Sequence, residues 1–168
     1  MKPAESLEKS TAGRPGFDTG SRNNSRKTCK KTSRKSTNYN DNIYKELFAQ
    51  PNDDEIKVAM ILIDQKIAKK ILFLAPELKK SSGTPDFVLN GREKWEIKTP
   101  KIFTDRALRH LFREALHQSP NVIFYLANAR KIPEDNVVRA IKRIFDILKS
   151  AKKLRIITRS GKVFDFTK

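Results

Sequence analysis

The chain has 168 residues, of which 36 are Lys or Arg and 19 are Asp or Glu, so its formal net charge is +17. This length fits one compact domain with a tail and excludes two ordinary domains. The sequence has no apolar run near the roughly 20 residues of a membrane-spanning helix and no secretory signal, so we expect a soluble protein made in the cytoplasm. The charge predicts a polyanionic partner, and nucleic acid is the commonest such partner.

The first predicted segment is residues 1–41. Residues 1–40 hold ten Lys and Arg against three acidic side chains and almost no large aliphatic ones, so they cannot bury enough apolar surface to fold. We predict a disordered basic arm that binds polyanions or serves as a solvated linker. Residues 42–168 are predicted to form one α/β domain, which is basic in its own right because residues 41–168 carry 26 Lys and Arg against 16 acidic residues.

Hydrophobic periodicity predicts the elements of this domain in chain order. A helix over 55–70, capped by Asp53 or Asp54, leads to a strand over 71–74. Asn90-Gly91 predicts a hairpin, because both residues tolerate positive φ. The two hairpin strands are predicted at 85–89 and 94–98. The elements predicted after the hairpin are helix 104–118, strand 121–127, a helix that begins at 133–135, and strands 154–158 and 162–166. This order predicts an α/β fold with a mixed central sheet flanked by helices.

The hairpin stretch PDFVLNGREKWEIK carries the candidate chemistry. Phosphodiester hydrolysis needs a cation that neutralises charge on the phosphate and activates water, and carboxylates are the ligands that hold Mg²⁺ or Mn²⁺. Asp86 and Glu96 supply two carboxylates, and the carbonyl of Ile97 is a candidate third ligand. Lys98 shares a strand face with Glu96, where it would orient the water or stabilise the phosphate charge.

The register of this hairpin tests the hypothesis. A two-residue loop would place Asp86 opposite Trp95 and leave Glu96 on the other face of the sheet. We therefore predict an odd-numbered loop or a bulge, which puts the two carboxylates on one face and leaves Trp95 as a core residue on the opposite face. The alternative is an ordinary hairpin in which these charges are turn chemistry and a solvated strand face.

Pro85-Asp86, followed after nine residues by Glu96-Ile97-Lys98, resembles the motif of the PD-(D/E)XK nuclease superfamily. The resemblance implies a restriction-endonuclease-like core of a helix, three strands, a helix and a strand, here with an added helix and two C-terminal strands. It also implies an assisting carboxylate on the first core helix, where Glu55 occupies the corresponding place.

A closer resemblance covers about residues 52–167, with the runs GTPDFVLNGREKWEIKTP and HQSPNVIFYLA. They are similar to the C-terminal tRNase domain of CdiA-type contact-dependent growth inhibition toxins and their phage or mobile-element relatives. That resemblance implies cleavage of RNA, most of all tRNA, and a cognate immunity protein, which charge complementarity predicts to be acidic. Those domains end very long secreted proteins, whereas this chain begins at Met1 with a short basic arm, so no signal supports its delivery to another cell.

The polar side of helix 104–118 is the predicted nucleic-acid surface. A solvated face is the ordinary reading of such a stripe, but its spacing of three and four also suits a grip on the RNA backbone beside the cut. Its members are Arg106, Arg109, His110, Arg113 and His117. Gln118 ends the helix near the place where the superfamily sometimes has an active-site glutamine.

Other functions remain open from the sequence. A metal-independent RNase would use His110 or His117 as general acid or base, with Thr158 or Arg159 near the scissile phosphate. A non-catalytic basic RNA-binding or regulatory protein would bind with a steep salt dependence and leave its substrate intact. DNA is an alternative substrate, because an α/β nuclease core is used on either polymer.

Overall fold

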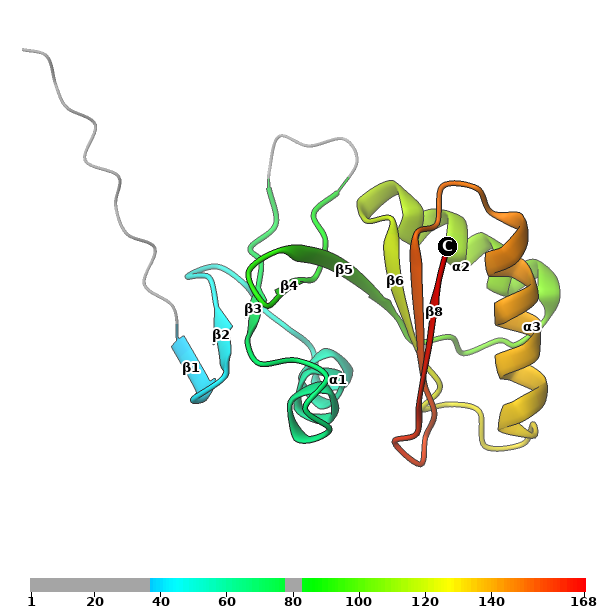
Figure 1. The fold of residues 1–168 in the computed structure, drawn as a ribbon, viewed down its shortest axis with the longest axis horizontal. Coiled ribbons are helices and arrows are strands. Elements are labelled where there is room, and N and C mark those ends of the chain that lie inside the picture. Colours follow the sequence, from blue (N-terminus) through cyan, green and yellow to red (C-terminus); the bar gives the residue numbers. More distant parts are fainter. Residues whose placement is uncertain (1–36, 78–82) are drawn as a thin grey trace, which may run out of the picture. The chain divides into compact units, whose positions relative to one another are not determined.

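The computed structural model describes residues 37–77 and 83–168, which form one mixed sheet and three helices (Figure 1). The elements in chain order are β1 (Thr37–Asn40), β2 (Ile43–Lys45), α1 (Asp53–Asp64), β3 (Ile71–Phe73), β4 (Phe87–Leu89), β5 (Glu93–Lys98), α2 (Asp105–Gln118), β6 (Asn121–Tyr125), α3 (Glu134–Ile147), β7 (Lys153–Ile157) and β8 (Val163–Thr167). The part from α1 to β6 has the predicted order of a helix, three strands, a helix and a strand, and the predicted added helix and two C-terminal strands follow it.

The strands lie in the sheet in the order in which they occur in the chain, from β1 to β8. The parallel pairs are β2–β3, β5–β6 and β6–β7, and the other neighbours are antiparallel. Each parallel pair is joined through one helix, because a parallel connection must cross back over the sheet. The predicted mixed sheet is therefore confirmed, and its mixed character follows from where the helices interrupt the strands.

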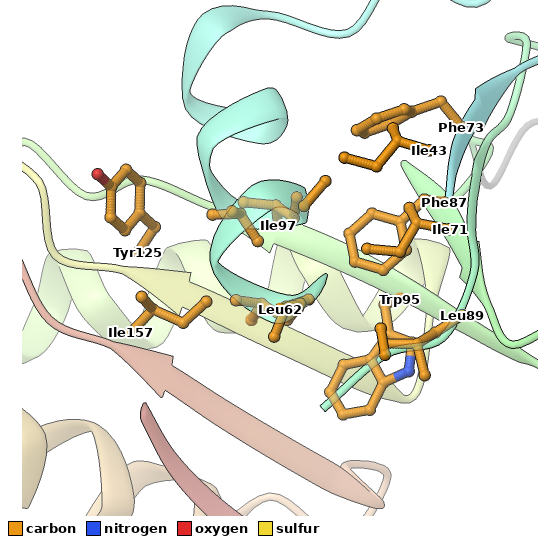
Figure 2. Packing of buried hydrophobic residues seen from close by; sticks show 14 of the residues in the cluster. Ile43, Leu62, Ile71, Phe73, Phe87, Leu89, Trp95, Ile97, Tyr125 and Ile157 are labelled. Carbon is orange, nitrogen blue, oxygen red and sulfur yellow. The ribbon is translucent and has the colours of Figure 1, made fainter. Parts of the chain in front are cut away.

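The two faces of the sheet carry separate hydrophobic clusters. One cluster joins α1 to a face of the sheet that extends from β2 to β7, and Figure 2 shows Leu62 of α1 on the same side as Trp95 and Ile97 of β5. The other joins α2 and α3 to the opposite face, where Val122 and Phe124 of β6 are fully buried. Trp95 is 2% exposed, so its predicted place in the core is confirmed.

Helix α1 is shorter than predicted and begins at a different cap. Asn52, rather than Asp53 or Asp54, is the N-cap, and its side chain accepts hydrogen bonds from the backbone N–H groups of Asp54 and Glu55. The Glu55 carboxylate accepts the Asn52 N–H in return, which completes a capping box. The helix stops at Asp64, before a turn that contains Lys66 with φ 58°.

The first two strands were not predicted. The predicted arm lies outside the described residues except for its end, Thr37–Asn40, which forms β1 against β2. The folded domain therefore starts before residue 42. Two strands of four and three residues leave little hydrophobic pattern in the sequence, because backbone pairing rather than an apolar face defines them. Within the described residues, no helix has the length and apolar character needed to cross a membrane.

Candidate active site

The β4–β5 hairpin has the predicted odd loop. Phe87 pairs with Trp95 and Leu89 pairs with Glu93, so three residues, Asn90 to Arg92, connect the strands. Asn90 and Gly91 both have positive φ, at 52° and 71°. The same register places Asp86 opposite Glu96, on the face of the sheet away from Trp95.

Asp86, Glu96 and Lys98 come together on this face with Gln118 from the end of α2. The backbone N–H of Ile97 donates to Asp86 Oδ2 at 2.6 Å. Glu96 Oε1 accepts two hydrogen bonds, from Lys98 Nζ at 2.8 Å and from Gln118 Nε2 at 2.7 Å. Glu96 Oε2 is buried and accepts no hydrogen bond from the described residues, and the Asp86 carboxyl lies close enough to the Glu96 carboxyl to hydrogen-bond to it when one of the two is protonated. The lysine and the glutamine therefore fix one oxygen of Glu96 and leave the other free.

Backbone packing holds Gln118 in this position. Gly83 has φ +74°, and a Cβ atom at this residue would lie 2.9 Å from Gln118 Oε1. A side chain at residue 83 would therefore press on the glutamine amide, and positive φ independently favours glycine there. The predicted glutamine thus contacts the candidate catalytic glutamate directly instead of lying only on the nucleic-acid surface.

Burial changes the acidity of the carboxylates. Burial and then the neighbouring charge of Asp86 raise the pKa of Glu96 from its ordinary 4.5 to about 7. The pKa of Asp86 is also raised by burial, although the Ile97 N–H and the Lys98 charge oppose the change. Two neighbouring carboxyl groups that both resist ionisation keep a shared proton to a higher pH than separate groups do, and a bound cation would take the place of that proton.

Glu55 borders the same site from α1. It lines a hollow of about 330 Å³ together with Asp86 and Gln118. Burial and then the Asp86 charge raise the pKa of Glu55 to about 7 as well. Its carboxylate also serves the capping box with Asn52, so its position is explained by helix capping and its acidity by the site.

The donor set fits a divalent cation. Asp86 and Glu96 offer hard oxygen ligands, and the unpaired Glu96 Oε2 is the kind of buried acceptor that a cation satisfies. In residues 37–77 and 83–168, no three His, Cys, Asp or Glu side chains are already gathered as an ion-binding group. A cation at this hairpin would thus have two carboxylate ligands, with backbone oxygen and water completing its shell.

The predicted nucleic-acid stripe lies on the outer side of α2. A hollow of about 650 Å³ is lined by Arg106, Arg109, His110 and Arg113. Arg109 is held by Asp105, with Nε donating to Oδ2 at 2.6 Å, whereas Arg106 and Arg113 are exposed. His117 is exposed, one position before Gln118.

Neighbouring hollows connect this stripe to the carboxylates. Glu55 lines both the Asp86 hollow and a second hollow of about 650 Å³ that also contains Lys98. Leu111 lines that second hollow and also a third hollow of about 400 Å³. His110 lines both this third hollow and the hollow of the arginine stripe. The basic surface and the carboxylate site thus border a series of adjoining depressions.

Two residues of the metal-independent alternative, His117 and Thr158, lie near different parts of the sheet. His110 is exposed, and its Nε2 atom lies 3.3 Å from Oε1 of Glu114. The buried Thr158 hydroxyl accepts the Lys162 N–H and bonds to Ser160, at the carboxyl end of β7. His117 lies just before the start of β6, whereas Thr158 follows the end of β7. Because β6 and β7 are parallel, His117 and Thr158 lie toward opposite ends of the sheet.

One residue of the Asp86 hollow was not among the residues predicted from the sequence. Phe48 lines it from the connection between β2 and α1, and its side chain is 75% exposed. No periodic pattern surrounds this residue. The available clue was a large aromatic residue in the loop that precedes the helix cap at Asn52.

Comparisons with known proteins agree with this architecture. Residues 82–163, just under half of the chain, match the family described as the contact-dependent growth inhibition CdiA C-terminal domain. The structure is similar to a CdiA-CT/CdiI toxin and immunity complex from Burkholderia pseudomallei, with a TM-score of 0.51, 17% identity, and coverage of 67% of this chain and 80% of that chain. No curated protein matches the chain. The predicted resemblance to CdiA C-terminal toxin domains is confirmed.

Proposed function

We propose that this chain is a metal-dependent endonuclease of the toxin type that hydrolyses phosphodiester bonds in RNA, with tRNA as its substrate. The observation that carries the proposal is the buried pair of Asp86 and Glu96, which shares one strand face with Lys98 and leaves Glu96 Oε2 without a partner. Ordinary strand charges would be solvated, whereas Glu96 is 2% exposed. This arrangement is the one expected of the PD-(D/E)XK motif.

Each residue has a distinct proposed role. Asp86 and Glu96 would hold Mg²⁺ or Mn²⁺, which when bound would offset negative charge building up on the phosphate and make the attacking water more acidic. Lys98 is placed to donate to a phosphate oxygen or to the water. Gln118 orients Glu96, and Glu55 places a third carboxyl group at the rim of the site, where it would assist the other two.

The charge distribution supports a polyanionic substrate. The net charge of +17 attracts nucleic acid, and the exposed Arg106 and Arg113 line a hollow that is linked to the Glu55 and Lys98 hollow through a third one between them. The match of residues 82–163 to the CdiA C-terminal domain supports the toxin type, and the choice of RNA, and of tRNA within it, rests on the resemblance of GTPDFVLNGREKWEIKTP and HQSPNVIFYLA to CdiA-type tRNase domains.

We further propose an acidic immunity protein as the cognate partner. The similar structure from Burkholderia pseudomallei is a complex of a toxin with an immunity protein, and a basic nuclease surface is best covered by a negatively charged one. Co-purification of this chain with the product of the neighbouring gene tests the proposal, and a recovered protein that does not inhibit cleavage would contradict it.

The nuclease proposal is tested on total tRNA with purified protein, with Mg²⁺ or with EDTA. We expect cleavage with Mg²⁺ and its loss with EDTA, and a loss of at least about a hundredfold in Asp86→Asn, Glu96→Gln and Lys98→Met, because removing a charge-stabilising group costs several kcal/mol at the transition state. Asp146→Asn, which removes an exposed carboxylate on α3, is the matched control and should retain activity.

Three other outcomes would change the conclusion. Cleavage that survives EDTA and Asp86→Asn but is lost in His117→Ala or His110→Ala would move the chemistry to the histidines. Cleavage of DNA in place of RNA would keep the site and change the substrate. Salt-sensitive binding without any cleavage would leave a basic RNA-binding protein.

A further inference from the structure

Phe48 is exposed at the rim of the carboxylate hollow. Its side chain is 75% exposed, the largest exposed fraction among the large hydrophobic residues described. The hollow that it lines also contains Asp86, Glu55 and Gln118 and measures about 330 Å³, within the roughly 300–1,000 Å³ of small-molecule sites. An aromatic ring is thus presented to solvent beside the proposed cleavage site.

The connection that carries Phe48 is fixed on both sides. The N–H of Glu46 donates to Phe73 O at 3.0 Å, and the Glu46 carboxylate accepts the N–H of Ala75 at 2.9 Å. Ala49, the residue after Phe48, is 2% exposed, and its N–H donates to Glu46 O at 3.0 Å. The backbone around the ring is therefore anchored to β3 and the segment after it, so the outward position of Phe48 is built into the connection.

The surroundings of the ring suit a flat, uncharged group. Pro51 and Pro76 line the same hollow, and Gln50 and Thr84 add polar side chains at its edge. The carboxylates in the hollow would repel a bare phosphate, whereas a nucleobase is neutral and presents a π-face that stacks on aromatic rings whatever its sequence. The rim therefore fits a base, and the carboxylates with their cation fit the adjoining phosphate.

We propose that Phe48 stacks on an unpaired nucleobase next to the scissile phosphate. This inference rests on the proposed nuclease function and deepens it, because a base that stacks on Phe48 must be out of a duplex. The substrate class is then a single-stranded end, loop or unpaired junction of RNA, the form in which bases are open to aromatic side chains.

Leu47 provides a matched control. It is the residue before Phe48 and is also exposed, at 55%. Phe48→Ala and Leu47→Ala each remove an exposed apolar side chain from the same connection, but only the first alters the carboxylate hollow. Phe48→Trp keeps a stacking ring, and Phe48→Leu keeps an apolar group without one.

The first experiment measures kcat/KM on an RNA that wild-type protein cleaves. We expect Phe48→Ala and Phe48→Leu to lose about tenfold, Phe48→Trp to stay near wild type and Leu47→Ala to change less than about twofold. Equal losses in Phe48→Ala and Leu47→Ala, or full activity in Phe48→Leu, would overturn the stacking role. The thermal midpoints of all four variants should agree, because both side chains are on the surface.

The second experiment does not need cleavage. A short single-stranded RNA containing 2-aminopurine is titrated with the Asp86→Asn variant, with and without Phe48→Ala. We expect quenching of the base fluorescence that depends on Phe48, and bound RNA without such quenching would overturn the inference. A wild-type protein that binds and quenches but never cleaves would contradict the nuclease proposal alone. If Phe48→Ala abolishes only immunity-protein binding, the ring serves a protein interface instead.

Discussion

Glu96 is both a buried residue of the sheet and a proposed ligand of the catalytic cation. It is a charged residue at a core position, 2% exposed, with one oxygen bonded to Lys98 and Gln118 and the other bonded to nothing described. A buried carboxylate without enough partners destabilises the fold, and functional sites are where such a cost is tolerated. Glu96 is therefore best explained by what it binds and not by how it packs.

This leads to a prediction about stability and pH. The folded pKa of Glu96 is raised from 4.5 to about 7, so the folded state binds its proton more tightly than the unfolded state does. Its favourable contribution is full below pH 4.5 and is lost as the pH rises to about 7, by up to about 3 kcal/mol. Urea unfolding of the metal-free protein should show this decline, and Glu96→Gln, which cannot ionise, should reduce it.

Magnesium provides the control for that measurement. If Asp86 and Glu96 hold the cation, Mg²⁺ should restore stability at pH 8 and do little at pH 5, because protons and the cation compete for the same carboxylates. The same Mg²⁺ concentration should leave Asp86→Asn unchanged. A Mg²⁺ effect that is equal at both pH values would contradict the assignment.

At the scale of elements, helix α1 brings a third carboxylate to the site through its cap. Asn52 accepts hydrogen bonds from the N–H groups of Asp54 and Glu55, both at 3.0 Å, and the Glu55 carboxylate returns to Asn52. The capping box thus sets the start of α1 and the position of Glu55 together.

We expect Asn52→Ala to lower the free energy of unfolding by about 1 kcal/mol and to reduce cleavage by releasing Glu55. Asn52→Ser retains a capping oxygen and should keep most of the stability. Denaturant melts and initial cleavage rates measure the two effects. Loss of stability without any change in rate would confine Glu55 to helix capping.

The elements differ in how far the sequence predicts them. Helix α2 was predicted from its apolar spacing with Thr104 as its cap, and Thr104 accepts the Ala107 N–H as expected. The odd hairpin loop was predicted because a metal site needs Asp86 and Glu96 on the same face of the sheet, which a two-residue loop would not allow. These features depend on local pattern and on a chemical requirement, both of which are visible in the sequence.

Other features depend on contacts between distant residues. The predicted helix over 55–70 continued past Asp64 because apolar residues such as Ile67 kept the helical spacing, whereas the chain turns there. The segment just after that turn is bonded to the β4–β5 hairpin, because Asn90 Oδ1 accepts hydrogen bonds from the N–H groups of Lys69 and Lys70. Likewise, the bond from Gln118 to Glu96 spans 22 residues. The hydrophobic periodicity of a segment does not show which distant residues it will contact.

At the scale of the whole molecule, charge predicts how binding responds to salt. Each Lys or Arg that contacts a phosphate of a single strand contributes about 0.7 to the slope of log affinity against log salt. Changing Arg106 and Arg113 together to Gln should therefore reduce the slope by about 1.4 without moving the Mg²⁺ dependence of cleavage.

The control removes the same charge elsewhere. Lys149 and Lys152 are exposed between α3 and β7, and their double change to Gln alters the net charge by the same amount. Filter binding over a range of KCl concentrations gives both slopes. Equal reductions would mean that RNA responds to the overall charge and not to the stripe on α2.

The strand order of the sheet has a consequence for the order of folding. Every strand pairs with its neighbour in the chain, from β1 to β8, so no strand waits for a partner made much later during synthesis. Asp86 and Glu96 therefore come from strands that are neighbours in the chain as well as in the sheet, and their meeting needs only the short β4–β5 hairpin to close. Gln118 lies 22 residues beyond Glu96, so its bond to Glu96 forms only when α2 packs against β5.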